Sequence, residues 1–182
     1  MQVFDHLMID IETLGKSNQA VITSIAAVQF NMGTGETGEE FHVHIDPSMQ
    51  GTNKIDGSTV LWWLQQSQEA RDRLVNGIKD HGVTLSDALF QLITFINNEC
   101  IKDILVWARP PKFDLNIIEN SLESYNIPIP WGYANSRCVR TLASFAPEIV
   151  KEFKATTIEH DALEDCYVQI KYCSKIWNRL KF

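Results

Sequence analysis

The chain has 182 residues, of which 45% are hydrophobic and 21% are charged, so its composition is that of a globular protein and excludes a disordered chain. The length fits one domain over residues 1–182. The formal net charge of -7 argues against a protein that coats nucleic acid through bulk positive charge, but it leaves room for an enzyme that meets nucleic acid at a local site.

The N-terminal part of the chain predicts an antiparallel meander of three strands. Leu7, Ile9 and Ile11 alternate on one face of the first strand, and the second strand is apolar and rich in β-branched residues. Turn-forming residues between positions 31 and 38 precede the third strand. The expected strands are Val3–Glu12, Val21–Phe30 and Glu40–Ile45.

The remaining sequence predicts helices that alternate with a short buried strand at Ile104–Trp107. Ser58 and Ser67 are candidate N-caps of the first two helices, and Thr84 or Ser86 begins the third. The other expected ranges are Ser58–Leu64, Gln68–Val75, a third helix up to Ile96, Phe113–Tyr125, Val139–Phe145 and His160 to the C-terminus. This order predicts the α/β class, with a mixed sheet covered by helices.

Neither a membrane span nor a secretory signal is evident. No apolar run approaches the ~20 residues that a span needs, and Met1–His6 lacks the basic region of a signal peptide. Cys166 and Cys173 lie ~10 Å apart on one predicted helix, too far for a disulfide. With Cys100 and Cys138 also isolated, we expect free thiols, a cytoplasmic location in a bacterial or phage-infected cell, and no membrane partner.

Two acids on the first strand are the strongest chemical signal. Asp10 and Glu12 are two residues apart, so both side chains lie on one strand face, while Ile9 and Ile11 point to the other. Acids inside an apolar strand are unfavourable unless they are paired or bound to a metal. Oxygen ligands suit Mg²⁺ or Mn²⁺. The pattern is short, however. Taken alone, it is explained better by a strand end where both acids simply reach solvent than by a metal site.

Further acids strengthen the metal interpretation. Asp114 stands where a helix begins, a position that the helix dipole also favours for an ordinary acid. Asp161 and Asp165 are one helical turn apart, and His160 precedes them. His160 alone would be an ordinary capping or surface histidine. The ordered set is more specific than any one cluster.

These residues resemble the three motifs of the DEDDh 3'-5' exonucleases, and in particular a small branch of phage and bacterial exoribonuclease-like proteins. The motifs stand here as Asp10-Ile-Glu12, Phe113-Asp114 and His160-x-Ala162-x-x-Asp165. Further shared segments are Thr13-Leu14-Gly15, Val60–Leu64, Val106-Trp107 and Arg137–Leu142. The resemblance implies a ribonuclease-H-like fold, with a five-stranded mixed sheet flanked by helices.

The resemblance also assigns roles to the motif residues. It implies two divalent ions, Mg²⁺ or Mn²⁺, bound by Asp10, Glu12, Asp114 and Asp165. Asp161 is expected to act from outside this ligand set or to face solvent. His160 would be the general base on the attacking water, which fits a free pKa of ~6.5. Two ions would stabilise the attacking and leaving oxygens of an in-line displacement.

The candidate substrate contacts are less specific. Thr13 and Leu14 complete the first motif, and Arg109 and Lys112 replace the small polar run that relatives tend to have before the third acid. The two basic residues could contact phosphates, or their loop could narrow the pocket. Trp62 and Trp63 diverge by about 100° on a helix. One is therefore expected in the core, and the other could stack on a terminal base.

Several other patterns have bland explanations. The G-x-G-x-x-G sequence from Gly33 to Gly38 leads into a strand and predicts a hairpin loop, not a dinucleotide site. His42 and His44 share a strand face without a third zinc ligand nearby. Arg137 and Arg140 fit structural pairing as well as phosphate contact. An apolar stripe near the C-terminus predicts core packing or a homodimer contact and comprises Ile176, Trp177, Leu180 and Phe182.

The sequence as a whole predicts a metal-dependent 3'-5' exonuclease. We expect it to act on the 3' ends of single-stranded RNA or DNA and to release nucleoside 5'-monophosphates. The alternatives are a non-catalytic nucleic-acid-binding module on the same fold, and a two-metal endonuclease. The intact set of acids and His160 argue against the binding module.

Overall fold

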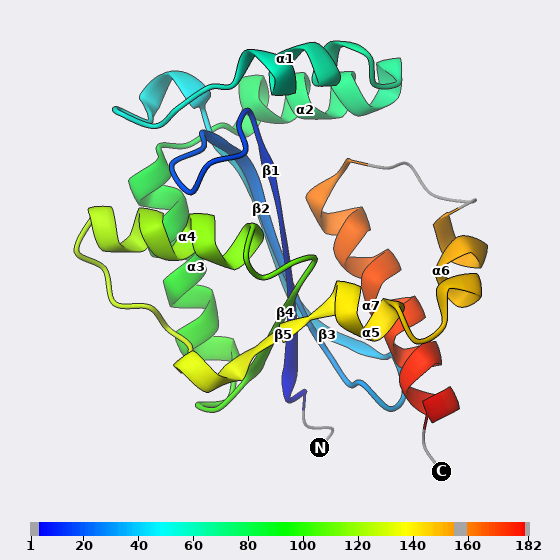
Figure 1. The fold of residues 1–182 in the computed structure, drawn as a ribbon. Helices are drawn as coiled ribbons and strands as arrows, with labels where there is room; N and C mark the ends of the chain where they lie inside the picture. The colour runs from blue at the N-terminus through cyan, green and yellow to red at the C-terminus, as the bar shows by residue number, and fades with distance from the viewer. Residues whose placement is uncertain (1–3, 155–159, 181–182) are drawn as a thin grey trace.

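The sheet contains the expected meander and two further strands. A computed structural model describes residues 4–154 and 160–180, and within them five strands form one mixed sheet in the order β3-β2-β1-β4-β5 (Figure 1). The strands are β1 (His6–Thr13), β2 (Ile22–Phe30), β3 (Thr37–His44), β4 (Leu105–Ala108) and β5 (Ser136–Cys138). β1, β2 and β3 pair antiparallel, while β4 pairs parallel to β1 and β5 parallel to β4. The predicted α/β class with a five-stranded mixed sheet is confirmed.

Helices cover both faces of the sheet and one of its ends. They are α1 (Gly57–Leu64), α2 (Gln68–His81), α3 (Leu85–Glu99), α4 (Asp114–Ser124), α5 (Val139–Ala143), α6 (Pro147–Lys154) and α7 (Ala162–Leu180). α3 and α4 lie on one face, and α5, α6 and α7 on the other (Figure 1). α1 and α2 lie across the end of the sheet at which β1 terminates. This end therefore gathers the end of β1, the α1–α2 pair and the start of α7.

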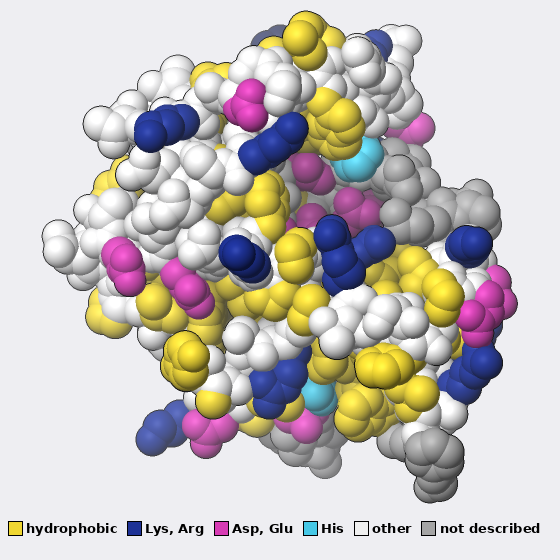
Figure 2. Space-filling model, viewed as in Figure 1, with side chains coloured by type: hydrophobic (Ala, Val, Ile, Leu, Met, Phe, Trp, Pro, Cys, Tyr) yellow, Lys and Arg dark blue, Asp and Glu magenta, His cyan; other side chains and the backbone are white. Residues whose placement is uncertain are grey.

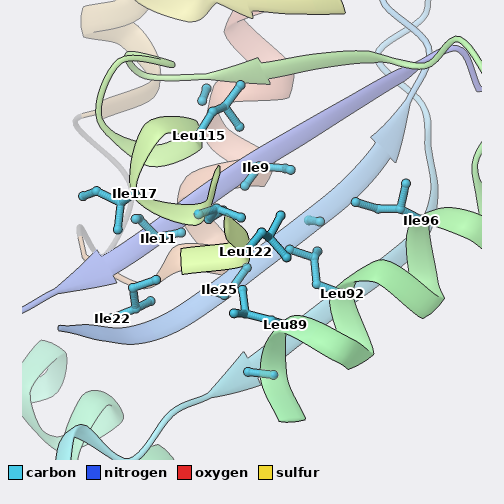
Figure 3. Close-up of a cluster of buried hydrophobic side chains, with 14 of the residues drawn as sticks. Ile9, Ile11, Ile22, Ile25, Leu89, Leu92, Ile96, Leu115, Ile117 and Leu122 are labelled. Carbon is cyan, nitrogen blue, oxygen red and sulfur yellow. The ribbon is translucent and has the colours of Figure 1, made fainter. Parts of the chain in front are cut away.

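β1 separates two hydrophobic clusters because its side chains alternate between the two faces. On one face, Leu7, Ile9 and Ile11 pack with apolar residues of α3 and α4, such as Leu92 and Leu122 (Figure 3). On the other face, Met8 packs with residues of β2 and α7. The second cluster stops short of the end of β1, where Asp10 and Glu12 take over that face.

Two of the three predicted helix N-caps agree with the structure, and the third does not. Ser67 and Thr84 cap α2 and α3, because their hydroxyl oxygens accept hydrogen bonds from Ala70 N and Asp87 N, both at 3.2 Å. The expected Ser58 cap of α1 is wrong. The carboxylate of Asp56 caps this helix by accepting from Ser58 N at 2.9 Å, which leaves Ser58 inside the first turn.

Other boundaries differ where local signals are weak. α2 continues to His81, beyond the expected end at Val75. β5 and α6 were not predicted. β5 is only three residues long, and it gains its hydrogen bonds from β4. Such pairing depends on tertiary contacts and leaves little periodicity in the sequence.

The remaining expectations concern cysteines, the C-terminal stripe and membranes. All four cysteines are free thiols. Ile176 is buried, whereas Trp177 and Leu180 are 41% and 37% exposed, and Phe182 lies outside the described residues. Core packing is therefore wrong for Trp177 and Leu180, and the homodimer contact stays a prediction. Within the described residues, no helix is long and apolar enough to cross a membrane.

Candidate active site

Asp10 and Glu12 lie near the end of β1 on the face that α7 covers. β4 pairs with β1 only through His6–Met8, so the two acids stand beyond the last residues that β4 covers. Ile9 and Ile11 point to the opposite cluster, as the alternation predicts. Because β4 no longer pairs with β1 beside them, both carboxylates can meet side chains from the β4–α4 connection and from α7.

Asp114 is the first residue of α4 and is only 3% exposed. Burial raises the pKa of its carboxyl to about 7, although backbone hydrogen bonds and nearby Arg140 favour the charged form. Its Oδ2 atom has no hydrogen-bond partner among the described residues. A buried carboxylate oxygen without a partner is unfavourable, which is the situation expected of a ligand atom that waits for a cation.

The start of α7 supplies His160 and Asp165. His160 has a φ of 74°, in the left-handed region that residues other than glycine adopt rarely. At this turn its backbone N–H donates to Asp165 Oδ2 at 3.2 Å. Asp161 caps the helix instead, because its Oδ1 accepts from Leu163 N and Glu164 N. Asp161 therefore has a structural role here, in agreement with its expected place outside the ligand set.

Helix α2 is connected to this same turn. Arg73 Nη1 lies 3.4 Å from Asp161 Oδ2, and Arg73 Nη2 lies 3.4 Å from Glu69 Oε1 within its own helix. The pair with Asp161 joins the α1–α2 layer to the residue that follows His160.

One cavity brings the predicted acids and His160 together. Its volume is about 320 Å³. Its wall comprises Asp10, Ile11, Glu12, Arg109, Phe113, Asp114, Arg140, His160, Asp165, Val168, Gln169 and Tyr172. Figure 2 shows a hollow where acidic side chains lie between a histidine and basic side chains. The three separated motifs thus contribute to one site.

The charges in this cavity repel one another in the absence of a cation. Burial, and then the neighbouring carboxylates, raise the pKa of Asp10 and Glu12 well above their ordinary values. A side-chain hydrogen bond from Gln169 Nε2 to Asp10 Oδ1 at 2.7 Å lowers the pKa of Asp10 and so opposes this effect. A divalent cation would remove this repulsion. It would also give Asp114 Oδ2 the partner that it lacks among the described residues.

The donor set fits a hard divalent cation. Glu12, His160 and Asp165 each offer a ligand atom, and these atoms lie within 4.8 Å of one another. Carboxylate oxygens dominate the cavity, which favours Mg²⁺ or Mn²⁺ over metals that prefer thiolates. The four cysteines do not line this cavity.

The two adjacent tryptophans have different environments. Trp63 is 5% exposed and its Nε1 donates to the Thr13 carbonyl at 2.9 Å, which holds α1 against the end of β1. Trp62 is 40% exposed, and its ring lies edge-on to the His160 ring with centroids 4.6 Å apart. The prediction that one tryptophan is core and the other is accessible is confirmed.

The remaining candidate substrate contacts are spread around the site. Arg109 lines the cavity, whereas Lys112 is exposed and does not. Thr13 is buried and its hydroxyl donates to the Gly15 carbonyl, and Leu14 also lies outside the cavity wall. Substrate contact by Thr13, Leu14 and Lys112 stays a prediction.

Three polar residues of the cavity wall were absent from the predicted site. Gln169 and Tyr172 follow Asp165 at positions i+4 and i+7, so helical spacing from the third motif would have found them. Arg140 was weighed only as an ambiguous cation, and its place in the wall shows that it faces the acids. Arg137 instead donates to the Ala134 and Ser136 carbonyls and is structural.

The other sequence patterns are structural as well. The glycine-rich segment forms the connection between β2 and β3, with Gly35 at a φ of 75°. His42 Nε2 lies 2.9 Å from Ser24 Oγ, and the His42 and His44 rings are 4.6 Å apart. Within the described ranges, no acid or cysteine completes a metal site around these two histidines.

Comparisons with known proteins give related results. A sequence model of the 3'-5' exoribonuclease Rv2179c-like domain matches residues 5–177. The chain is 27% identical over 197 residues to an exodeoxyribonuclease of Enterobacteria phage T4, and the match covers 90% of this chain and 85% of that protein.

Similar solved structures are nucleases of the same architecture. E. coli exonuclease I in complex with a dA16 oligonucleotide has a TM-score of 0.69 at 18% identity, over 96% of this chain and 41% of that one. Cell-death related nuclease 4 has a TM-score of 0.66 at 14% identity, over 97% of this chain. The chain spans 65% of that nuclease's length, so the likeness concerns a part of each larger protein. The predicted ribonuclease-H-like fold is confirmed.

Proposed function

The chain belongs to the family of 3'-5' exoribonuclease Rv2179c-like domains and is a 3'-5' exonuclease, and from this we infer a specific reaction and substrate. We propose that it hydrolyses the last phosphodiester bond at the 3' end of single-stranded RNA or DNA and releases nucleoside 5'-monophosphates. The observation that carries the proposal is the convergence of all four predicted acids and His160 on one cavity, from segments far apart in the sequence.

The four carboxylates would hold two divalent cations, Mg²⁺ or Mn²⁺. Asp10, Glu12, Asp114 and Asp165 all line the cavity, and Asp114 Oδ2 lacks a hydrogen-bond partner among the described residues. Ions bound there would neutralise these carboxylates and stabilise the charge that develops on the scissile phosphate. Gln169, which donates to Asp10, orients that carboxylate within the ligand set.

His160 is suited to act as the general base. It lines the cavity beside Glu12 and Asp165, and the Trp62 ring packs against its imidazole. An imidazole nitrogen takes a proton from the attacking water while the water oxygen forms a bond to phosphorus. The bond from phosphorus to the 3' oxygen of the preceding nucleotide breaks, and that oxygen takes a proton from solvent. The products are a nucleoside 5'-monophosphate and a chain shorter by one nucleotide.

The size and charge of the site favour a single-stranded end. A cavity of about 320 Å³ accommodates a terminal nucleotide rather than a duplex. The net charge of -7 weakens long-range attraction to a phosphate backbone, so binding depends on contacts at the site. Exposed Trp62 offers a surface on which the terminal base can stack.

End-labelled oligonucleotides test the proposal. With Mg²⁺ or Mn²⁺, a 5'-labelled single strand should give a ladder that shortens one nucleotide at a time, and a 3'-labelled strand should release labelled mononucleotide first. Parallel RNA and DNA substrates measure the sugar preference. A chelator should stop both reactions.

A matched pair of variants separates the site from general charge effects. Asp10→Asn removes one cavity acid, whereas Asp72→Asn removes an exposed acid of α2. Only the first should abolish the ladder. Internal cleavage products would favour an endonuclease, and binding without any cleavage would favour a non-catalytic module.

A further inference from the structure

The cavity has a basic side that the proposed metal site does not use. Arg109 and Arg140 both line it. Neither guanidinium forms an ion pair with a carboxylate in the parts of the chain that the structure describes. Arg109 instead lies over the Tyr172 ring, with its Cζ atom 5.9 Å from the ring centroid. Two guanidiniums without carboxylate partners in one cavity are a site for an anion.

Tyr172 provides an independent sign that this side of the cavity binds a ligand. The whole residue is 0% exposed, yet it contributes to the cavity wall. Its hydroxyl has no hydrogen-bond partner among the described residues. Buried polar groups are rarely left unpaired, so a donor in this position is expected to find its acceptor in a ligand or a water molecule.

The α7 helix places this basic side next to the acids. Asp165, Gln169 and Tyr172 occupy positions i, i+4 and i+7, which share one face of a helix. Asp165 lies beside the other acids, and Gln169 donates to Asp10. Tyr172 lies about two helical turns after Asp165, which is ~10 Å along the helix axis. A strand that enters the cavity therefore meets the acids and the arginines in succession.

We propose that Arg109, Arg140 and Tyr172 bind the phosphate of the nucleotide that precedes the one being removed. This inference rests on the proposed function. The terminal nucleotide of a 3' end carries only the scissile phosphate, which belongs over the acids. The one neighbouring phosphate of the chain lies on the 5' side, so it is the anion that a second subsite in the same cavity would take. Guanidiniums and a tyrosine hydroxyl are donors that match its oxygens.

Neutral methylphosphonate linkages test the proposal at single-phosphate resolution. One single-stranded oligonucleotide carries the neutral linkage next to the scissile bond on its 5' side, and a second carries it several linkages away. For the wild-type protein with Mg²⁺, the adjacent replacement should lower kcat/KM for the first cleavage by roughly tenfold, whereas the remote one should have little effect.

The variants show whether these side chains bind the charged phosphate next to the scissile bond. Arg109→Gln and Arg140→Gln should each lower kcat/KM on the unmodified strand, and should lose most of the extra penalty of the adjacent methylphosphonate. Tyr172→Phe removes only the hydroxyl and should give a smaller change of the same kind. Arg179→Gln is the control, because Arg179 pairs with Glu148 on an exposed surface. It should behave as the wild type does.

Two results would overturn the subsite. One is a wild-type protein that is indifferent to the adjacent methylphosphonate. The other is a penalty that stays the same in both arginine variants, which would mean that the arginines only balance the cavity acids. Thermal melting of each variant identifies any loss of fold, and the wild-type measurement stands without the variants. Failure of the wild type to shorten the unmodified strand would instead contradict the proposed function.

Discussion

One face of β1 is apolar along the strand, whereas the opposite face becomes acidic after Met8. Ile9 and Ile11 contribute to the cluster with α3 and α4. On alternate positions of the same strand, Asp10 is half-buried and Glu12 is buried, and the pKa of each carboxyl is raised well above its ordinary value. The same backbone hydrogen bonds to β2 hold both sets of side chains in place.

This contrast indicates a division of labour between stability and activity. Burial of the isoleucines favours folding, because apolar surface leaves water. Burial of the acids opposes folding until a cation neutralises them, because each buried charge loses solvation and repels its neighbours. The apolar face thus supports a site whose acids destabilise the metal-free protein. Substitutions on the apolar face should therefore lower stability, whereas substitutions on the acidic face should lower activity.

The largest effect is expected for Asp10→Asn. This change keeps an oxygen for the Gln169 amide but removes the charge. We expect kcat/KM to fall by about a thousandfold or more, since a cation that Asp10 would hold would stabilise the developing charge of the transition state by several kcal/mol. Steady-state kinetics on a labelled single strand measure the loss. Activity near the wild-type level would remove Asp10 from the site.

The opposite signature is expected for Ile9→Ala on the apolar face. Ile9 is 0% exposed, and truncation should lower the free energy of unfolding by about 2–5 kcal/mol. The milder Ile9→Val should lower it by about 1 kcal/mol. Urea unfolding measures both. The folded fraction should retain its kcat, and a selective loss of kcat with unchanged stability would break the proposed division.

A smaller effect is expected for α1, which lies across the end of the sheet next to the site. Trp62→Ala should raise KM by about tenfold with little change in melting temperature, because base stacking contributes about 1–3 kcal/mol and the side chain is 40% exposed. Trp63→Phe should instead lower stability, since it loses the bond to the Thr13 carbonyl. Unchanged KM for Trp62→Ala would exclude stacking on this ring.

The sequence predicted the elements whose signals are local. The alternation in β1 and the hydroxyl caps at Ser67 and Thr84 are determined by neighbouring residues, and the structure confirms them. β5 was missed because three residues carry no periodicity of their own. The cap of α1 was assigned two residues too late, since both Asp56 and Ser58 are good capping residues.

The site was predictable where spacing carries information. Asp10 and Glu12 share a face by strand alternation, and the order of the motifs pointed to Asp114, His160 and Asp165. Of the basic side, Arg109 was predicted as a candidate phosphate contact, whereas the role of Arg140 was left open. Arg140 follows β5, so its place in the cavity depends on a strand that the sequence did not reveal.

Thermal unfolding of wild type and Asp10→Asn, across pH 5 to 8 with and without Mg²⁺, tests the central claim most directly. Burial raises the pKa of Asp10, Glu12 and Asp114 above ordinary values of 3.8 to 4.5, and that of Asp114 to about 7. The folded protein therefore binds more protons than the unfolded chain in this range, so metal-free stability should fall as pH rises through about 7.

Mg²⁺ should restore wild-type stability at pH 8 and hardly change it at pH 5. Asp10→Asn should be more stable than the wild type without metal at pH 8 and should respond less to Mg²⁺. A wild-type melting temperature that ignores both pH and Mg²⁺, or an Asp10→Asn variant less stable than the wild type at pH 8, would contradict the account.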